Sequence, residues 1–297
     1  MQVITTRHGA GKLATKVFVS SEDSFNVTSV IVMGQKECIL VDTQWTRANA
    51  HRVIAEILET GLKLKAIFCT HAHPDHYWGL GEISEAFPEA KCYAPKPVCT
   101  LYAHQYQPKL DEWENIIGSD NLCRRQCARL EPLEGDCLEL EGEKLEVIRC
   151  MGDLMWNTIV WIPSIRTVIG SDVIFNDAHP FTCEVNAEQR KLWYKDIEGI
   201  EALGAEVIIP GHMREGTALD GSALDFMRRY LIATEEEIAA AATPGEFYYH
   251  MAKRFPTASL NLLSNEMNAE VFKGGRNWNW NEDPDPAWLA FRTCWKD

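Results

Sequence analysis

The sequence predicts an α/β protein in which β-sheets are layered between helices. Of its 297 residues, 46% are apolar, which is enough to form a large core. Short apolar segments with the period of a strand alternate with segments that have the period of a helix, through two successive halves of the chain. No internal repeat interrupts this alternation. We therefore expect a layered sandwich with one continuous core, and a single domain over residues 1–297.

The first half opens with a predicted hairpin and helix. Residues 27–32 and 37–42 are apolar segments on either side of a Gly-Gln turn, and the second ends on an acidic residue. Apolar residues then recur at helical spacing over residues 47–58. Thr46 stands where it can cap the start of this helix, and Gly61 where it can cap the end.

The remaining elements follow from the same two periods. Further strands are predicted at residues 64–70, 91–94, 145–150, 157–162, 167–174 and 205–210. Further helices are predicted at residues 80–87, 188–203 and 218–242. The stretch 95–132 carries prolines and cysteines, and its pattern is ambiguous between helix and loop.

Composition disfavours several classes of function. The charge of −14, from 29 basic and 43 acidic residues, would repel nucleic-acid backbones and anionic lipid, so neither partner is expected. No run of about 20 apolar residues occurs, and we expect a cytoplasmic protein without a membrane span or a secretory leader. The ten cysteines contain no Cys-x-x-Cys pair, which favours reduced thiols.

Potential metal ligands are most concentrated in the segment His-Ala-His-Pro-Asp-His at residues 71–76. Side chains two apart on an extended segment point the same way, so His71 and His73 can bind one cation through imidazole nitrogens. The proline ends the strand, and the turn after it can direct Asp75 and His76 towards a second cation. Four potential ligands within six residues indicate a metal site.

Three further candidate ligands lie at or near other predicted strands. Asp153 follows one strand, Asp172 lies within another, and His212 follows the Pro-Gly pair that closes a third. A rigid sheet holds ligands in place better than a mobile loop does. Asp172 alone would be an ordinary turn carboxylate, but beside the histidine cluster it becomes a candidate ligand.

These motifs resemble the metallo-β-lactamase superfamily from about residue 27 to residue 212. In that family the His-x-His-x-Asp-His motif is followed by a Gly-His-Thr-Pro-Gly-His segment, a metal-bridging Asp and a late Gly-His. Here residues 71–76 match the first motif, Asp172 the bridging carboxylate and His212 the last histidine. The resemblance implies an αββα sandwich of two mixed sheets flanked by helices. We expect residues 218–297 to form a helical and aromatic C-terminal extension packed on it.

The chain departs from the family at the third element, where Asp153 stands in place of a histidine. Aspartate is a hard oxygen ligand for zinc, manganese or iron, so a site of His71, His73 and Asp153 is chemically feasible. We expect two ions, with zinc favoured and manganese or iron as alternatives. A weak or lost first ion, which leaves one cation on the remaining ligands, stays open.

The resemblance implies hydrolysis. Asp75 and Asp172 would hold a metal-bound hydroxide that attacks a carbonyl carbon. His179, expected on a loop over the site, is the candidate proton donor to the leaving group, and an exposed or structural role is its alternative. Asp42 is expected to orient a ligand or loop near the site.

Aromatic residues beside the ligands favour a small, flat or apolar substrate, and Tyr77, Trp78 and Trp156 are the residues concerned. We expect a hydrolase that opens a lactam or lactone, such as a benzoxazolinone-type lactam, in detoxification of an aromatic metabolite or xenobiotic. The alternatives are a thioesterase for carrier-protein or coenzyme A thioesters, and a non-catalytic binding protein with a degenerate metal site. The expected partner is a small molecule, and homo-oligomer formation is left open.

The tail after residue 242 is too apolar and aromatic to stay solvated. Trp278 and Trp280 lie within it, and we expect it to fold back on the sandwich and help to wall the substrate pocket. Packing away from the site is an alternative of equal weight.

Overall fold

The structure is a computed structural model, and it describes residues 1–7 and 13–278. Seven strands form the first sheet, in their order along the chain. They are β1 (Gln2–Arg7), β2 (Ala14–Val19), β3 (Thr28–Met33), β4 (Glu37–Val41), β5 (Lys63–Phe68), β6 (Lys91–Ala94) and β7 (Leu130–Pro132). Strands β1 to β4 pair antiparallel and β4 to β7 pair parallel, so the sheet is mixed.

The second sheet is also mixed. Its strands lie in the order β13 (Val207–Ile209), β11 (Thr167–Ile169), β10 (Asn157–Ile162), β9 (Glu143–Cys150) and β8 (Cys137–Leu140). β11 and β13 are parallel, and the other neighbours are antiparallel. Two short parallel strands, β12 (Phe175–Asn176) and β14 (His212–Met213), form a separate pair.

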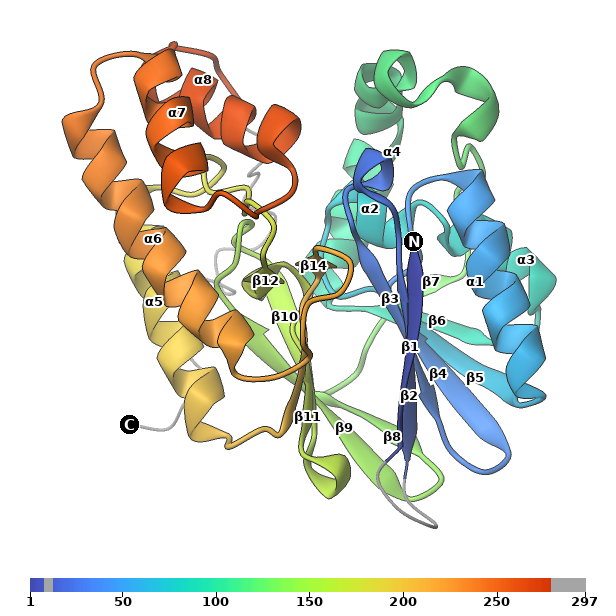
Figure 1. Cartoon of the computed structure of the whole chain (residues 1–297). Helices are drawn as coiled ribbons and strands as arrows, with labels where there is room; N and C mark the ends of the chain where they lie inside the picture. The colour runs from blue at the N-terminus through green and yellow to red at the C-terminus, as the bar shows by residue number, and fades with distance from the viewer. Residues whose placement is uncertain (8–12, 279–297) are drawn as a thin grey trace.

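The helices lie outside the two sheets, some on their outer faces and others at one end of the sandwich (Figure 1). They are α1 (Arg47–Thr60), α2 (Pro74–Tyr77), α3 (Leu80–Ala86), α4 (Lys96–Ile117), α5 (Ala187–Ala202), α6 (Ser222–Ala240), α7 (Pro244–Arg254) and α8 (Glu266–Lys273). α1 and α3 flank the first sheet, and α5 and α6 flank the second (Figure 1). The predicted αββα sandwich of two mixed sheets flanked by helices is confirmed.

Alternation along the strands explains why their apolar runs are continuous. In β4, Cys38 and Leu40 pack with the residues of α1, whereas Ile39 and Val41 pack with residues of the other sheet. Successive side chains of a strand point to opposite faces. A strand that is covered on both faces therefore needs an apolar residue at nearly every position.

Local capping places the first long helix as predicted. Thr46 accepts a hydrogen bond from the Asn49 amide at 3.3 Å, and Gly61 ends the helix in the left-handed region at φ 69°. The preceding hairpin of β3 and β4 is also present. The helix then returns the chain to β5, whose end leads to the histidine segment.

The strand expected at residues 167–174 requires correction. β11 ends at Ile169, and Asp172 lies in a short 3₁₀ turn at Ser171–Val173. Ser171 adopts φ 45°, a left-handed conformation that a continuing strand does not permit. The turn removes Asp172 from the sheet and projects it beyond the strand end.

Two other differences concern element type. The ambiguous stretch after residue 95 contains α4, a helix of 22 residues with Pro108 in its interior. β1 and β2 were not predicted, and they extend the first sheet beyond the hairpin. Lys16 and Arg7 break the apolar pattern in these strands, which explains why the pattern was weak.

The described part of the C-terminal extension packs on the second sheet and α5. Phe247, Met251 and Phe255 share one hydrophobic cluster with Ile159 and Trp193. The tryptophans at 280, 288 and 295 lie outside the described residues. No helix in the described ranges has the length and apolarity that a membrane span needs. The nine cysteines within those ranges are free thiols.

Gly211 packs so closely against the turn of Asp172 that a side chain has no room there. A Cβ at this position would overlap the Ser171 backbone and Oδ1 of Asp172. We expect Gly211→Ala to displace the turn and to lower the free energy of unfolding by about 1–3 kcal/mol, the usual cost of overpacking. Urea unfolding measures this, with Gly221→Ala as the control because nothing lies within 4 Å of a Cβ at that position. Equal stability of the two variants would contradict the prediction.

Candidate metal centre

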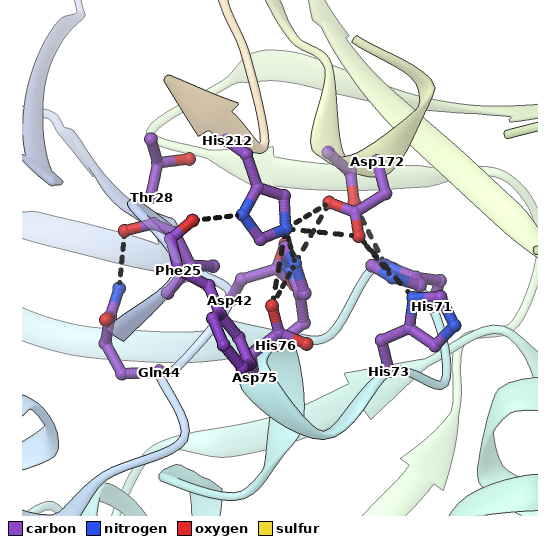
Figure 2. Close-up of polar contacts among 12 residues, drawn as sticks. Phe25, Thr28, Asp42, Gln44, His71, His73, Asp75, His76, Asp172 and His212 are labelled. Atoms are coloured by element: carbon purple, nitrogen blue, oxygen red, sulfur yellow. Dashed lines mark hydrogen bonds and ion pairs between the residues drawn. The ribbon is translucent and has the colours of Figure 1, made fainter. Parts of the chain in front are cut away.

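The candidate ligands gather where strands from both sheets end (Figure 2). His71 and His73 follow β5, and α2 begins directly afterwards and carries Asp75 and His76. β9, β11 and β13 run in the same direction, so the segments after them meet at one edge of the second sheet. Those segments carry Asp153, Asp172 and His212.

One group of ligands comprises Asp75, His76 and His212, all buried. Nε2 of His212 lies 3.3 Å from Oδ2 of Asp75 and 3.3 Å from Nε2 of His76. The same nitrogen lies 3.2 Å from Oδ1 of Asp172, and Nε2 of His76 lies 3.0 Å from that oxygen. Figure 2 shows these atoms pointing at one another.

A second group comprises His71, His73, Asp153 and Asp172, also buried. Oδ2 of Asp172 lies 3.2 Å from Nε2 of His71 and 3.5 Å from Nδ1 of His73. Nδ1 of His73 also lies 3.2 Å from Oδ2 of Asp153. Asp172 therefore contacts both groups, as a bridging carboxylate does.

Three of these imidazoles, His76, His212 and His71, also make a polar contact through the ring nitrogen that does not face the other ligands. Nδ1 of His76 lies 2.8 Å from Oδ2 of Asp42, and Nδ1 of His212 donates to the Phe25 carbonyl at 2.7 Å. Nδ1 of His71 lies 3.0 Å from the hydroxyls of Thr70 and Ser171. Such contacts fix the tautomer and ring orientation of a metal ligand.

The residues fit a pair of metal ions. Four imidazole nitrogens and three carboxylates converge, which is the donor set of zinc, manganese and iron sites. Nε2 of His71 and Oδ1 of Asp172 are buried, and none of their close contacts within the described residues has the geometry of a hydrogen bond. Buried polar atoms without a hydrogen bond are rare, so their convergence here indicates a ligand position.

The pKa values of the cluster reflect dense buried charge. Burial lowers the pKa of His71 to about 4. Burial and the charge of Asp172 raise the pKa of Asp153 to about 8 although His73 opposes the shift. For His212, the carboxylates of Asp172 and Asp75 outweigh burial and raise its pKa to about 10. Metal binding to these groups must displace protons, so its affinity depends on pH.

A pocket of about 570 Å³, part of it open to solvent, adjoins both groups. Its polar side presents His73, Asp75, Asp153, Asp172 and His212. Its apolar lining comprises Phe25, Trp113, Phe175, Phe181, Leu260, Leu263 and Trp278, and part of it adjoins the ligands, since the Phe175 ring stacks on His212 at a centroid distance of 4.8 Å. The tail residue Trp278 thus lines the pocket, together with Leu260 and with residues of the π-helical turn Asn261–Asn265 before α8.

The aromatic wall differs from the one expected from the sequence. Tyr77, Trp78 and Trp156 are fully buried in the core of the first sheet and do not line the pocket. Trp78 stacks on Trp45 at a centroid distance of 6.2 Å. Adjacency in sequence to the ligands was misleading, because all three side chains pack into the hydrophobic cluster that the first sheet shares with α1.

The structure does not bring His179 to the metal centre. Its Nδ1 lies 2.9 Å from the Tyr230 hydroxyl on α6, and its ring packs against Phe255. The side chain is buried, and it is absent from the described residues that line the pocket. This position favours the structural role over that of proton donor.

Two charged residues that line the pocket were not predicted from the sequence. Glu184 lies in the loop before α5, and Lys109 lies on α4, where its Nζ donates to the Ala72 carbonyl at 3.0 Å. Neither has a chemical neighbour in the sequence that would signal a site. Only the tertiary fold brings them to the histidines.

The matches to known proteins agree with this geometry. Residues 23–212 match the model of the metallo-beta-lactamase superfamily, which is well over half of the chain. The chain belongs to this superfamily. Among solved structures, a metallo-beta-lactamase from Pontibacter korlensis has a TM-score of 0.59 at 17% identity, over 78% of this chain and 99% of that one. A metallo-beta-lactamase family protein from Thermus thermophilus has a TM-score of 0.59 at 19% identity, over 82% and 88%. These two show the superfamily fold.

Curated relatives match over a shorter region. A hydroxyacylglutathione hydrolase of Edwardsiella ictaluri is 34% identical over 70 residues, which are 24% of this chain and 26% of that protein. One of Vibrio cholerae is 35% identical over 68 residues, which are 22% and 25%. The chain therefore spans about a quarter of the length of the curated relatives that it matches.

The double change His71→Ala with His73→Ala should lower the bound metal and abolish metal-dependent hydrolysis. We expect the chain to stay folded, because both imidazoles follow a strand end and lie outside its hydrophobic clusters. Elemental analysis after dialysis measures the metal, and circular dichroism checks the fold. His51→Ala with His104→Ala is the matched control, since both of these histidines are exposed. Full metal content and activity in the first variant would rule out the assignment.

Proposed function

We propose that this protein is a metal-dependent hydrolase that opens a small aromatic or apolar lactam or lactone. The observation that carries the proposal is the pocket, whose lining combines the ligand groups with aromatic and aliphatic side chains. A flat ring against those side chains would present its carbonyl to the ligand groups. A cytoplasmic role in detoxification is part of the same proposal.

The centre is proposed to hold two ions, with zinc favoured over manganese or iron. Asp153 then serves as the third ligand beside His71 and His73, where the superfamily has a histidine. Its two oxygens have separate contacts, which supports this role. Asn157 donates to Oδ1 at 3.1 Å, and Oδ2 faces Nδ1 of His73 at 3.2 Å. The amide thus fixes one oxygen and leaves the other directed at the site.

Bound divalent cations supply Lewis-acid chemistry, since they lower the pKa of water and polarise a carbonyl. The chain supplies position and proton transfer. Asp75 and Asp172 line the pocket with acceptor oxygens that can orient a water molecule for attack. With His179 elsewhere, we assign to Asp75, one of the carboxylates that line the pocket, the transfer of a proton from that water to the leaving group. The apolar wall excludes competing water.

A thioesterase is the second candidate, because the curated relatives with local similarity are named hydroxyacylglutathione hydrolases. Glutathione carries two carboxylates, which require basic partners when they are buried. Of the described residues that line the pocket, Lys109 is the one lysine or arginine. Its Nζ already donates to a backbone carbonyl. This charge balance favours an uncharged substrate.

A substrate panel tests the proposal. The zinc-loaded protein should hydrolyse an aromatic lactone or lactam with a kcat/KM at least about tenfold above that for S-lactoylglutathione, as expected from a pocket difference of about 1–3 kcal/mol. Chelator treatment should remove the activity, and added zinc should restore it. Preference for the thioester would favour the second candidate. Loaded protein that hydrolyses none of these compounds would contradict both.

Asp153→His tests the ligand role of Asp153. Imidazole is a better zinc ligand than a carboxylate, and the change removes one negative charge. We expect zinc affinity at the site of His71 and His73 to rise by about tenfold or more, which corresponds to about 1.4 kcal/mol. Competition with a chromogenic chelator measures the dissociation constant. Unchanged zinc stoichiometry and affinity would show that residue 153 does not face the metal.

A further inference from the structure

Glu184 is a buried carboxylate in the pocket wall that the proposed reaction does not use. It lies in the loop between β12 and α5, two residues before the Asn186 cap of that helix. It is not part of either ligand group. A carboxylate at such a depth is costly unless it has partners, and its partners identify its role.

The first partner is the imidazole of His73. Oε2 of Glu184 lies 3.1 Å from Nε2 of this ring, while Nδ1 of the same ring faces Asp153 at 3.2 Å. A neutral imidazole that offers the Nδ1 lone pair to a cation carries its proton on Nε2. Donation of that proton to Glu184 selects this tautomer and fixes the plane of the ring.

The second partner comes from the C-terminal segment. Nε1 of Trp278 donates to the same Oε2 of Glu184 at 3.3 Å. The Trp278 ring also packs against Phe181 and Trp113, at centroid distances of 5.8 and 6.2 Å. One carboxylate oxygen therefore contacts both a candidate metal ligand and the aromatic wall of the pocket.

The loop that carries Glu184 is held on both sides. Oδ1 of Asn268, on α8, accepts from the Thr182 amide at 2.9 Å and from the Cys183 amide at 3.0 Å. On the other side, Asn186 and Gln189 form a reciprocal capping box at the start of α5. Contacts in both directions limit the freedom of the backbone, so the carboxylate is presented from a fixed position.

We propose that Glu184 is a positioning residue that fixes the metal-binding tautomer of His73 and at the same time anchors Trp278 in the pocket wall. The orientation of a ligand and the closure of the wall by the C-terminal segment then depend on one side chain. This inference concerns metal affinity and the wall, and it does not depend on which bond the protein hydrolyses.

Glu184→Leu tests the first half of the inference. We expect zinc affinity to fall about 10- to 100-fold, the usual effect of removing the hydrogen-bond partner of a metal ligand. Glu184→Gln keeps an acceptor oxygen for Nε2 of His73, so its loss of affinity should be smaller. Glu188→Gln is the matched control, because this carboxylate is exposed and pairs with Lys191 on the surface. Zinc dissociation constants from chelator competition are compared for the four proteins, without any substrate.

The second half is read from protease sensitivity. Chymotrypsin should cleave after Trp278 faster in Glu184→Leu than in the unaltered protein, because the anchor of the indole is lost. Trp278→Phe keeps an aromatic ring but removes the indole N–H that donates to Glu184. Because Glu184 still accepts from His73, this variant should leave zinc affinity unchanged. Wild-type zinc affinity in both Glu184 variants would overturn the positioning role, and wild-type cleavage in Glu184→Leu would overturn the anchor. If Glu184→Leu fails to fold, Glu184→Gln still decides the first point, since an affinity below that of Glu188→Gln is required.

Discussion

The shared carboxylate of Asp172 is the constraint on which the arrangement of the centre depends. Its oxygens lie 3.0 Å from Nε2 of His76 and 3.2 Å from Nε2 of His71, so Asp172 contacts a histidine of each ligand group. Burial alone would raise the pKa of this carboxyl, yet the surrounding histidines hold it well below its usual range. A buried anion is stable only where opposite charge is fixed around it. The first sheet supplies most of that charge and the second supplies Asp172, so the two halves of the sandwich must meet for the centre to exist.

The fold meets this demand with backbone geometry that is unusual at several points. Ser171 precedes Asp172 at φ 45°, and Asp42, which contacts His76, lies at φ 60°. Non-glycine residues in this region are strained, and such strain persists where surrounding contacts over-determine it. The amide and hydroxyl of Thr70 both contact Oδ1 of Asp42, which supplies contacts of that kind. The centre is thus held by a second layer of buried polar residues as well as by the strand ends.

The sequence predicted the site residues that lie close together in one segment, and it did not predict those that only the fold brings together. The segment at residues 71–76 predicted its own clustering because strand and turn geometry act over a few residues. Asp172 was predicted as a ligand by its match to the family motif. The strand predicted around it was too long, because β11 ends at Ile169. For the pocket wall, the expected contribution of the tail is present at Trp278, but Phe25, Trp113 and Leu263 were not predictable because they reach the pocket from distant segments. The expected position of His179 over the site was wrong, because no pattern in the neighbouring sequence indicates that Tyr230 of α6 and Phe255 contact its ring.

The donor types of the two ligand groups bear on which cations they can hold. His73 is flanked by carboxylates on both ring nitrogens, with Asp153 at Nδ1 and Glu184 at Nε2. A site of three neutral imidazoles holds a borderline-soft cation such as zinc, whereas an added carboxylate oxygen favours harder cations. Hydrogen bonding to Glu184 also makes the ring a more basic ligand. Both groups include a carboxylate in this way, Asp153 in one and Asp75 in the other, and the rear contact of Glu184 has a counterpart in Asp42 behind His76. If two ions bind, their sites therefore offer similar donors, and they differ in that the described lining residues of the pocket include Glu184 but not Asp42.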